Sequence, residues 1–408
     1  MSSKGFTSSL PFKLIVALVV GTFAGIVLST FEGNSFANAV MNIAVTVRYI
    51  AGQFINFCVP LIIIGFVAPS ITRLGQNASR MLLLALTLAY ISSIGAAFLA
   101  TFAGYSILPF MNIESEVEGL KALPDVIFKL NINPVMPVIS ALFLSITVGL
   151  AAAWNKSKYV INLLEEFQKI VLSIVMFFLI PVLPWLIGTT FCGLAYEGSI
   201  TKQFPVFVAI ILIVMAGHYI WMALLYFIAG VYSGKNPFNI IKHYGPAYMT
   251  AVGTMSSAAT LSVALECARK SEPTLRDDMV NFGIPLFANI HLCGSVMTET
   301  FFVMAVSKIL YGVYPTVGNM ILFCLLLGIF AIGAPGVPGG TVMASLGLIT
   351  GVLGFDATGT ALMLTIFALQ DSFGTACNVT GDGALTLILT GYAEKHGIGE
   401  EKLENILG

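Results

Sequence analysis

Two carboxylates, a carboxamide and two glycines interrupt an otherwise apolar segment near the end of the chain. They stand in the run Asp371-Ser-Phe-Gly-Thr-Ala-Cys-Asn378-Val-Thr-Gly-Asp382. A carboxylate at bilayer depth costs at least a few kcal/mol unless something compensates it, so such residues are functional by default and indicate a cationic partner. Asp371 and Asp382 are about three helical turns apart. We therefore expect them to serve a bound ammonium group and a bound cation along one stripe of one helix.

The composition is that of a polytopic membrane protein. Of the 408 residues 57% are hydrophobic and only 10% are charged, whereas a soluble protein has about 25% charged residues. The net charge of −1 gives no basic signature for nucleic acid. The six cysteines form no CxxC pair, so we interpret most of them as small buried apolar side chains.

Eight apolar segments are interpreted as membrane spans, and several exceed the ~20 residues that a span needs. Two further stretches, 240–269 and 317–353, have apolar arms around a tip rich in Gly, Ser or Pro. Such a pattern predicts a re-entrant helical hairpin, whose irregular tip is tolerated where it lines a cavity. The expected spans lie near residues 11–31, 37–71, 81–107, 135–154, 160–194, 204–232, 279–312 and 358–393.

The positive charges support this arrangement. With the N-terminus and both ends of the first hairpin inside, only four of the 19 lysine and arginine residues fall outside: Lys121, Lys129, Lys202 and Lys308. This bias follows the positive-inside rule. We therefore expect an all-α membrane protein with eight transmembrane helices, two re-entrant hairpins and both termini in the cytoplasm.

The two parts of the second half are alike, because each is a broken hairpin followed by a long helix with polar residues. Discontinuous segments at corresponding positions of inverted repeats indicate the binding site of a secondary transporter. The sequence therefore predicts a small-molecule site where the two hairpins and the following helices meet.

On these motifs the chain resembles the dicarboxylate/amino acid:cation symporters, the glutamate transporter family, and the order of elements matches over nearly the whole length. The most specific match is Asn378-Val-Thr-Gly-Asp382 with Asp371 upstream. The second hairpin tip matches through Gly336-Val-Pro-Gly339, and the first, more loosely, through Ser256-Ser-Ala-Ala-Thr-Leu261.

The resemblance implies an elevator-type transporter in a homotrimer. Residues 1–80 and 108–200 would form a static scaffold. Residues 81–107 and 201–408 would form a mobile transport domain, with the second hairpin as the extracellular gate. The resemblance further implies the plasma membrane, here the inner membrane of a prokaryote, and no cofactor besides the transported cation.

Residue by residue, the resemblance assigns the substrate amino group to Asp371. It assigns the substrate carboxylate to Asn378 and the serine tip of the first hairpin. Asp382 would be a cation ligand, and Asn378 a second one if sodium binds. A structural interhelical hydrogen bond is the alternative for each carboxylate. The full implied substrate site is Ser256, Ser257, Val337, Pro338, Asp371, Gly374, Thr375 and Asn378.

Gly374 departs from the pattern of acidic amino acid transporters, which carry an arginine at this position. Arginine pairs with a carboxylate through a planar fork, and glycine offers no charge. An acidic substrate would leave a buried carboxylate unpaired. Together with the retained Asp371 this favours a neutral amino acid. A dicarboxylate or acidic amino acid that finds another cation is the alternative.

The seventh span departs as well. It reads His291-Leu-Cys293-Gly-Ser295 where the family carries Asn-Met-Asp-Gly-Thr, so sodium ligands are lost. Hard cations prefer oxygen ligands, and Tyr90-Ile-Ser-Ser93 of the third span retains hydroxyls only. Glu299 lies eight residues after His291, roughly on the same face of a continuous helix, and proton-cotransporting relatives also carry a glutamate there. We expect this pair to take part in proton coupling, with purely structural roles as the alternative.

Three functions compete. The first is a secondary active transporter driven by H⁺, Na⁺ or both. The second is an uncoupled facilitator or channel on the same fold. The third, an intramembrane hydrolase, is disfavoured because Cys293 and His291 would diverge by about 200° on one helix, and we expect no enzyme.

Overall fold

The computed structural model describes residues 10–31, 34–75, 80–111, 113 and 123–398, and every regular element in these ranges is helical. The first half holds α1 (Leu10–Thr30), α2 (Ser35–Gly75), α3 (Arg80–Ile107), α4 (Val138–Trp154), α5 (Lys158–Ile174) and α6 (Ile180–Glu197), with a short 3₁₀ helix η2 (Leu108–Phe110) and a π-helical segment η3 (Val175–Leu179). The second half holds α7 (Ser199–Ser233), α8 (Phe238–Ile241), α9 (Gly245–Thr254), α10 (Ser257–Arg269), α11 (Asp277–Ile290), α12 (Cys293–Tyr311), α13 (Val317–Gly333), α14 (Gly340–Gly351) and α15 (Ala357–Lys395).

Several of these helices are long and apolar enough to cross a membrane, as the composition predicted. In the described part of the chain, six of the eight expected spans meet both the length and the hydropathy criterion. The other two are α4, which has only 17 residues, and α15, which has 39 residues but carries the polar motif. Among the described residues six candidate spans meet both criteria: Phe12–Thr30, Ser35–Pro69, Arg80–Phe110, Lys158–Glu197, Val206–Ser233 and Asp277–Tyr311.

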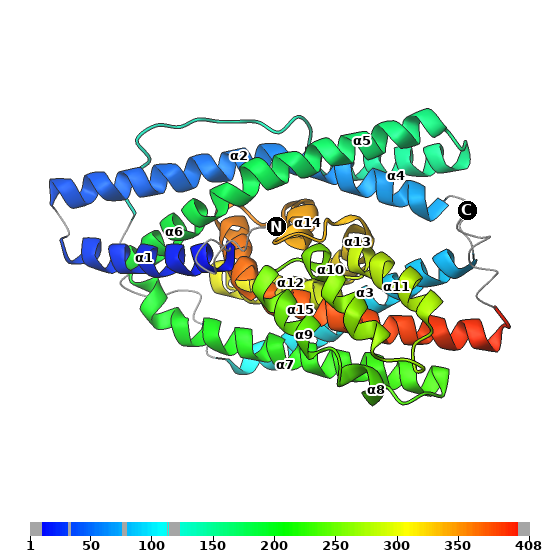
Figure 1. Cartoon of the computed structure of the whole chain (residues 1–408). Coiled ribbons are helices and arrows are strands. Elements are labelled where there is room, and N and C mark those ends of the chain that lie inside the picture. The colour runs from blue at the N-terminus through cyan, green and yellow to red at the C-terminus, as the bar shows by residue number, and fades with distance from the viewer. Residues whose placement is uncertain (1–9, 32–33, 76–79, 112, 114–122, 399–408) are drawn as a thin grey trace.

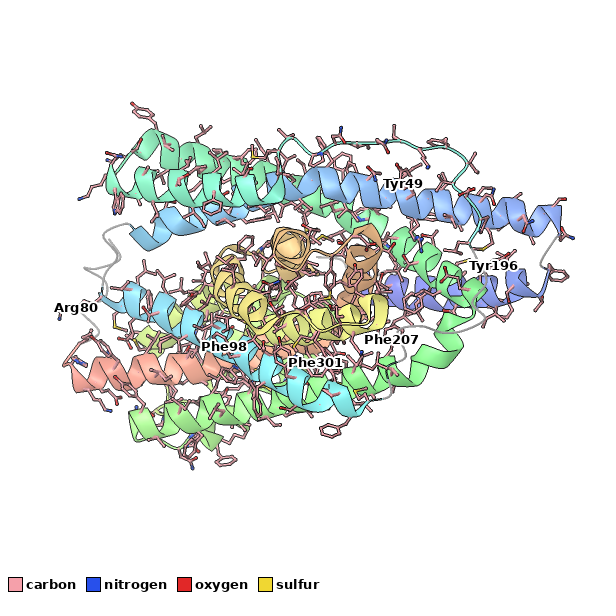
Figure 2. The ribbon with its side chains drawn as sticks, turned by 180° about the vertical axis from the view of Figure 1, so that it is seen from behind. Tyr49, Arg80, Phe98, Tyr196, Phe207 and Phe301 are labelled. Carbon is pink, nitrogen blue, oxygen red and sulfur yellow. The ribbon has the colours of Figure 1, made fainter. Side chains whose placement is uncertain are left out.

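The helices form two packed groups (Figure 1). One contains α1, α2, α4, α5 and α6, and the other surrounds α12 and α15 with α3, α7 and the remaining helices. Figure 2 shows the groups from behind, with Tyr49 of α2 on one side of the molecule and Phe98 of α3 on the other. Between the groups, α13 and α14 pack against α2, whereas α9 and α10 pack mainly against α11 and α15.

Glycines let α1 and α6 pack closely and in parallel. A Cβ atom at Gly21 would lie 2.1 Å from the carbonyl oxygen of Gly188, and one at Gly25 would lie 2.2 Å from that of Cys192. Small residues at such crossings allow backbones to approach inside membranes. Gly21 meets Gly188 and Gly25 meets Cys192, so the two helices run in the same direction. The expected topology requires this of the first and fifth spans.

Both helical hairpins form where the interrupted segments predicted them. The first is α9 and α10, which join at Met255 and Ser256, and the Ser256 hydroxyl accepts a hydrogen bond from the Ala259 N–H at 3.2 Å as the cap of α10. The second is α13 and α14, joined by residues 334–339. Its tip needs glycine at Gly339, because the backbone there has φ of 71°.

The seventh expected span is not one continuous helix. It breaks between α11 and α12 at His291 and Leu292, whose φ/ψ angles are −112°/105° and −125°/39°. The expectation that His291 and Glu299 share a face of one helix is therefore wrong, since the helical angle does not carry across the break. The same break removes the angular argument used against a Cys293–His291 pair.

Candidate functional site

Asp371 lies on α15 and reaches the tip of the second hairpin. Its Oδ2 accepts a hydrogen bond from the Gly339 N–H at 2.6 Å, and the Thr375 hydroxyl lies 3.4 Å from Oδ1. The side chain is only 3% exposed. The carboxylate expected to bind the substrate amino group thus touches the hairpin expected to act as a gate.

Asn378 lies two turns further along α15 and caps the start of α12. Its Oδ1 accepts from the N–H groups of Gly294 at 2.7 Å and Ser295 at 3.2 Å, and its Nδ2 donates to the Ser295 hydroxyl at 2.9 Å. The first N–H groups of a helix have no partner within that helix. The carboxamide supplies one, which ties the broken span to α15.

His291 occupies the break between α11 and α12 and bridges two helices. Its Nδ1 lies 2.9 Å from Asp382 Oδ1 on α15, and its Nε2 lies 2.8 Å from the Ser92 hydroxyl on α3. All three side chains are buried. With Nδ1 protonated, the imidazole donates to the carboxylate, and Nε2 accepts from Ser92 in the neutral form or donates to it in the imidazolium form.

Glu299 faces a different neighbour from His291. Its Oε1 accepts a hydrogen bond from the Ser345 hydroxyl on α14, the second arm of the second hairpin. Among the described residues its Oε2 has no hydrogen-bond partner, although the side chain is fully buried. Glu299 therefore connects the centre of α12 to the hairpin.

The two hairpin tips close on one another beside these groups. The Ser256 hydroxyl donates to the carbonyl oxygen of Gly336 at 2.6 Å, and the Ala258 N–H points to the same oxygen at 3.3 Å. Ser257 is buried, and Val337 and Pro338 are partly buried within the second tip. The expected substrate residues thus come from three segments that meet at the hairpin tips and α15.

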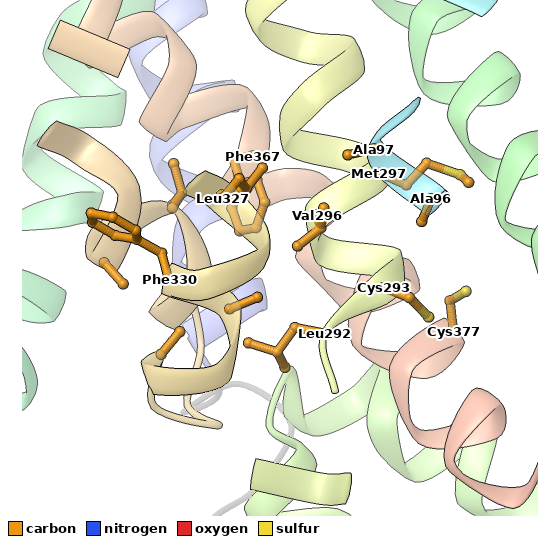
Figure 3. Packing of buried hydrophobic residues seen from close by; sticks show 14 of the residues in the cluster. Ala96, Ala97, Leu292, Cys293, Val296, Met297, Leu327, Phe330, Phe367 and Cys377 are labelled. Carbon is orange, nitrogen blue, oxygen red and sulfur yellow. The ribbon is translucent and has the colours of Figure 1, made fainter. Parts of the chain in front are cut away.

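Gly374 lies against the backbone of α12. A Cβ atom there would lie 3.2 Å from the backbone N and Cα of Ser295, and one at Gly294 would lie 2.4 Å from the carbonyl oxygen of Gly374. Glycines on both helices therefore permit their close approach. Figure 3 shows Cys293 and Cys377 pointing toward each other at this crossing.

Comparison with known proteins identifies the family of this chain. A model of the sodium:dicarboxylate symporter family matches residues 10–392. The chain belongs to this family. Its members are transporters, and the resemblance seen in the motifs is confirmed.

Two relatives illustrate the range of the family. Excitatory amino acid transporter 2 of Mus musculus is 27% identical over 245 residues, which cover 58% of this chain and 41% of the relative. The serine/threonine transporter SstT of Acinetobacter baylyi is 31% identical over 193 residues, which cover 45% of this chain and 47% of the relative. The alignments span less than half the length of either relative.

Sodium, the coupled ion that names the family, was expected at Asp382 and Asn378. In this chain Asp382 Oδ1 already pairs with the imidazole of His291, and Asn378 Oδ1 accepts two N–H groups of α12. In addition, the described residues contain no group of three or more His, Cys, Asp or Glu arranged to hold a metal ion. The Oδ1 atoms of both residues named for sodium thus already have partners within the protein.

The contacts that three residues make in this site were not foreseen from the sequence. Ser92 and Ser345 are the partners of His291 and Glu299, and His218 on α7 lies 3.0 Å from the Gly294 carbonyl and 2.9 Å from the Thr298 hydroxyl. No recognisable motif surrounds His218 in the sequence. Ser92 belongs to the stretch Tyr90-Ile-Ser-Ser93, whose hydroxyls are noted above, but its pairing with His291 depends on the fold. Ser345 and His218 are polar side chains in apolar helices, and such side chains are too common to single out two of them.

Proposed function

We propose that this symporter imports a small neutral amino acid and couples its uptake to protons, to a reduced number of sodium ions, or to both. The observation that carries the substrate class is a charge pattern. No lysine or arginine occurs in the segments that meet at the site, residues 253–262, 291–300, 333–341 and 371–382. An acidic side chain would therefore enter with its carboxylate unpaired, which costs several kcal/mol.

The amino group of the substrate would bind at Asp371. This carboxylate is buried and its one strong partner is a neutral N–H of the hairpin tip. A charged ammonium group is a stronger donor than a peptide N–H. The substrate carboxylate would then meet Asn378 and the start of α10 at Ser256 and Ser257, where a helix N-terminus favours an anion.

The coupling residues would be His291, Asp382 and Glu299. Histidine side chains can take up and release a proton, and His291 contacts the carboxylate that the family motif assigns to a cation. Glu299 is buried, one of its oxygens accepts from Ser345 of the second hairpin, and the other has no partner in the part of the chain that the structure describes. Protonation of His291 would thus change its contact with Asp382 on α15, and protonation of Glu299 would change its contact with Ser345 on the second hairpin.

The relatives support one substrate class each. SstT is named a serine/threonine transporter, which agrees with a small neutral amino acid. The excitatory amino acid transporters point to the alternative, an acidic substrate. The charge pattern of the site favours the first.

The surrounding architecture is part of the same proposal. The two helix groups would be a scaffold and a transport domain of an elevator-type homotrimer. The chain would cross the plasma membrane eight times with both termini in the cytoplasm and the two hairpins re-entrant. The contacts of the second hairpin with α2 and α4 support a position between the proposed domains, where a gate would act.

Uptake into proteoliposomes tests the proposal. Labelled serine, alanine, aspartate and succinate are offered under an imposed proton gradient or an imposed sodium gradient, one at a time. We expect concentrative uptake of a neutral amino acid that the proton gradient drives more strongly than the sodium gradient. Accumulation driven by sodium alone, and unchanged in His291→Ala and Glu299→Gln, contradicts proton coupling. Equilibration without accumulation under either gradient indicates a facilitator.

A further inference from the structure

A cavity of about 330 Å³ lies between α7, α9 and α15. Four tyrosines line it, and we call it the tyrosine pocket; its walls include Tyr219, Met222, Tyr226, Tyr244, Tyr248 and Thr380. Small-molecule sites in proteins start at about this volume and combine aromatic walls with a few convergent polar groups. None of its lining residues belongs to the hairpin tips, and only Thr380 comes from the α15 segment of the candidate site.

Two hydroxyl groups in the pocket have no partner among the described residues, although both side chains are over nine-tenths buried. They are the hydroxyls of Tyr244 and Thr380. The other three tyrosines are bonded: Tyr219 to Tyr248 at 2.9 Å, and Tyr226 to the carbonyl oxygen of Thr380 at 2.8 Å. Buried polar groups in native proteins are nearly always paired, so the two hydroxyls are available to a molecule that enters the pocket.

The residues that line the pocket favour a cationic ligand over an anionic one. None of the residues that line the pocket is charged, so an anion would find no basic partner. Gly383 lets the Tyr226 and Tyr244 hydroxyls lie against the backbone directly after Asp382, since a Cβ atom at Gly383 would lie 2.7 Å and 3.0 Å from these two oxygens. Hydroxyl oxygens accept the N–H groups of an ammonium, and tyrosine rings attract cations.

We propose that the tyrosine pocket binds a small primary ammonium group, at a site separate from the transported substrate. The mouth of the pocket includes Tyr219 and Ile241, which are 52% and 38% exposed. Ile241 precedes Lys242, which the charge distribution places on the cytoplasmic side. The ammonium can come from a free organic amine or from the headgroup of an ethanolamine phospholipid in the inner leaflet, because both present the same group there.

The test uses ethanolamine as the probe and ethylene glycol as its uncharged match. Binding is measured by calorimetry on the purified full chain in detergent, in an Asp371→Asn background that removes the proposed amino-binding carboxylate of the substrate site. We expect ethanolamine to bind and ethylene glycol not to. Tyr244→Phe should weaken binding about 10- to 100-fold, because it removes one hydrogen bond to a charged group. Thr380→Val should act in the same direction.

Tyr244→Phe keeps the ring and removes a hydroxyl that has no partner, so without ligand it should melt no lower than the parent. Tyr159→Phe is the matched control, since Tyr159 is 92% exposed on α5 and should leave binding unchanged. Equal affinity in the parent and Tyr244→Phe, or no binding of ethanolamine, overturns the proposal. Equal binding of ethylene glycol overturns its charge preference.

The source of the ammonium is decided in lipid nanodiscs of phosphatidylethanolamine mixed with phosphatidylglycerol. Native mass spectrometry then counts the lipids that stay on the parent chain and on Tyr244→Phe. Retained phosphatidylethanolamine that is lost in Tyr244→Phe assigns the headgroup. Binding of ethanolamine without such retention assigns a free amine. Either result supports the ammonium site.

Discussion

The imidazole of His291 and the carboxylate of Asp382 lie 2.9 Å apart in the interior of the second helix group, and both side chains are at most 1% exposed. They join the break between α11 and α12 to the polar motif of α15. A buried carboxylate without a partner is costly, and here the partner is a side chain of the same protein. Asp382, which the family motif assigns to a bound cation, thus has His291 of the same chain as its partner.

His291→Asn should increase the dependence of this protein on sodium. Asparagine lacks the cationic form of the imidazole and supplies a carboxamide oxygen, which hard cations accept as a ligand. Asp382 then gains more from a sodium ion than in the parent. We expect the melting temperature of His291→Asn to be lower in KCl and to recover in NaCl at equal ionic strength.

The parent protein in the same two salts is the control and should respond less. A parent that is stabilised by sodium as strongly as the variant contradicts the idea that His291 takes the place of the cation.

Asp371→Asn should abolish measurable substrate binding in a folded protein. The carboxamide oxygen can still accept from the Gly339 N–H, so the hairpin contact survives. The bond to a charged amino group is lost, which costs roughly 1.5–3 kcal/mol, or 10- to 100-fold in Kd. Calorimetry with the transported amino acid measures this. Thr375→Val is the milder comparison, because Thr375 lies 3.4 Å from the carboxylate. Unchanged affinity in Asp371→Asn means that the amino group binds elsewhere.

Gly374→Arg should shift the substrate preference toward aspartate or glutamate. With an acidic substrate the guanidinium pairs with the side-chain carboxylate. With a neutral substrate the guanidinium stays buried without a partner, which is costly. The structure adds a cost, because a Cβ atom at this position would be 3.2 Å from Ser295 backbone atoms. Gly374→Ala separates that cost from the effect of charge, so the ratio of acidic to neutral affinity is compared between the two variants. A folded Gly374→Arg with the same ratio as Gly374→Ala removes this position from the specificity site.

Much of the fold could be predicted from local patterns in the amino-acid sequence. Apolar length predicted the long helices, and the Gly, Ser and Pro tips predicted both hairpins, because an interrupted apolar run has few other solutions in a membrane. The break at His291 could not be read in this way, since neither Gly nor Pro stands at residues 291 and 292. It depends on the capping of α12 by Asn378, a residue 84 positions from Gly294.

The candidate site was predictable in its residues and not in their partners. The acidic positions stood out because carboxylates are rare in apolar helices. Which side chain faces each one depends on tertiary packing: His291 contacts Ser92 across 199 residues, and Glu299 contacts Ser345 across 46. Gly374 was interpreted through charge alone, and its packing role became visible only with α12 beside it.

Gly294→Ala should strongly destabilise the protein. The added Cβ atom would lie 2.4 Å from the Gly374 carbonyl oxygen and 2.5 Å from the Cys377 Cβ, and neither atom can move without shifting α15. We expect a loss of about 3 kcal/mol or more, the upper range for overpacking. Gly253→Ala in α9 is the control, because its Cβ atom meets nothing within 4 Å and alanine favours a helix by roughly 0.5–1 kcal/mol. Equal melting temperatures of the two variants contradict the close approach of α12 and α15.

His218 should act on substrate binding through Gly294, and the two substitutions His218→Gln and His218→Met separate this role from simple packing. His218 Nε2 lies 3.0 Å from the Gly294 carbonyl, and the N–H of Gly294 donates to Asn378. Gly294 is thus bonded through both its carbonyl and its N–H, which positions the carboxamide proposed to bind the substrate carboxylate.

Glutamine can place an N–H donor where Nε2 stands, whereas methionine fills the space without a donor. We expect KM to rise about tenfold in His218→Met with a smaller change in kcat, and to stay within about threefold in His218→Gln, because loss of a buried hydrogen bond costs roughly 1–3 kcal/mol. Uptake kinetics in proteoliposomes provide both constants. If the two variants raise KM alike, or change kcat alone, His218 only fills space in the core.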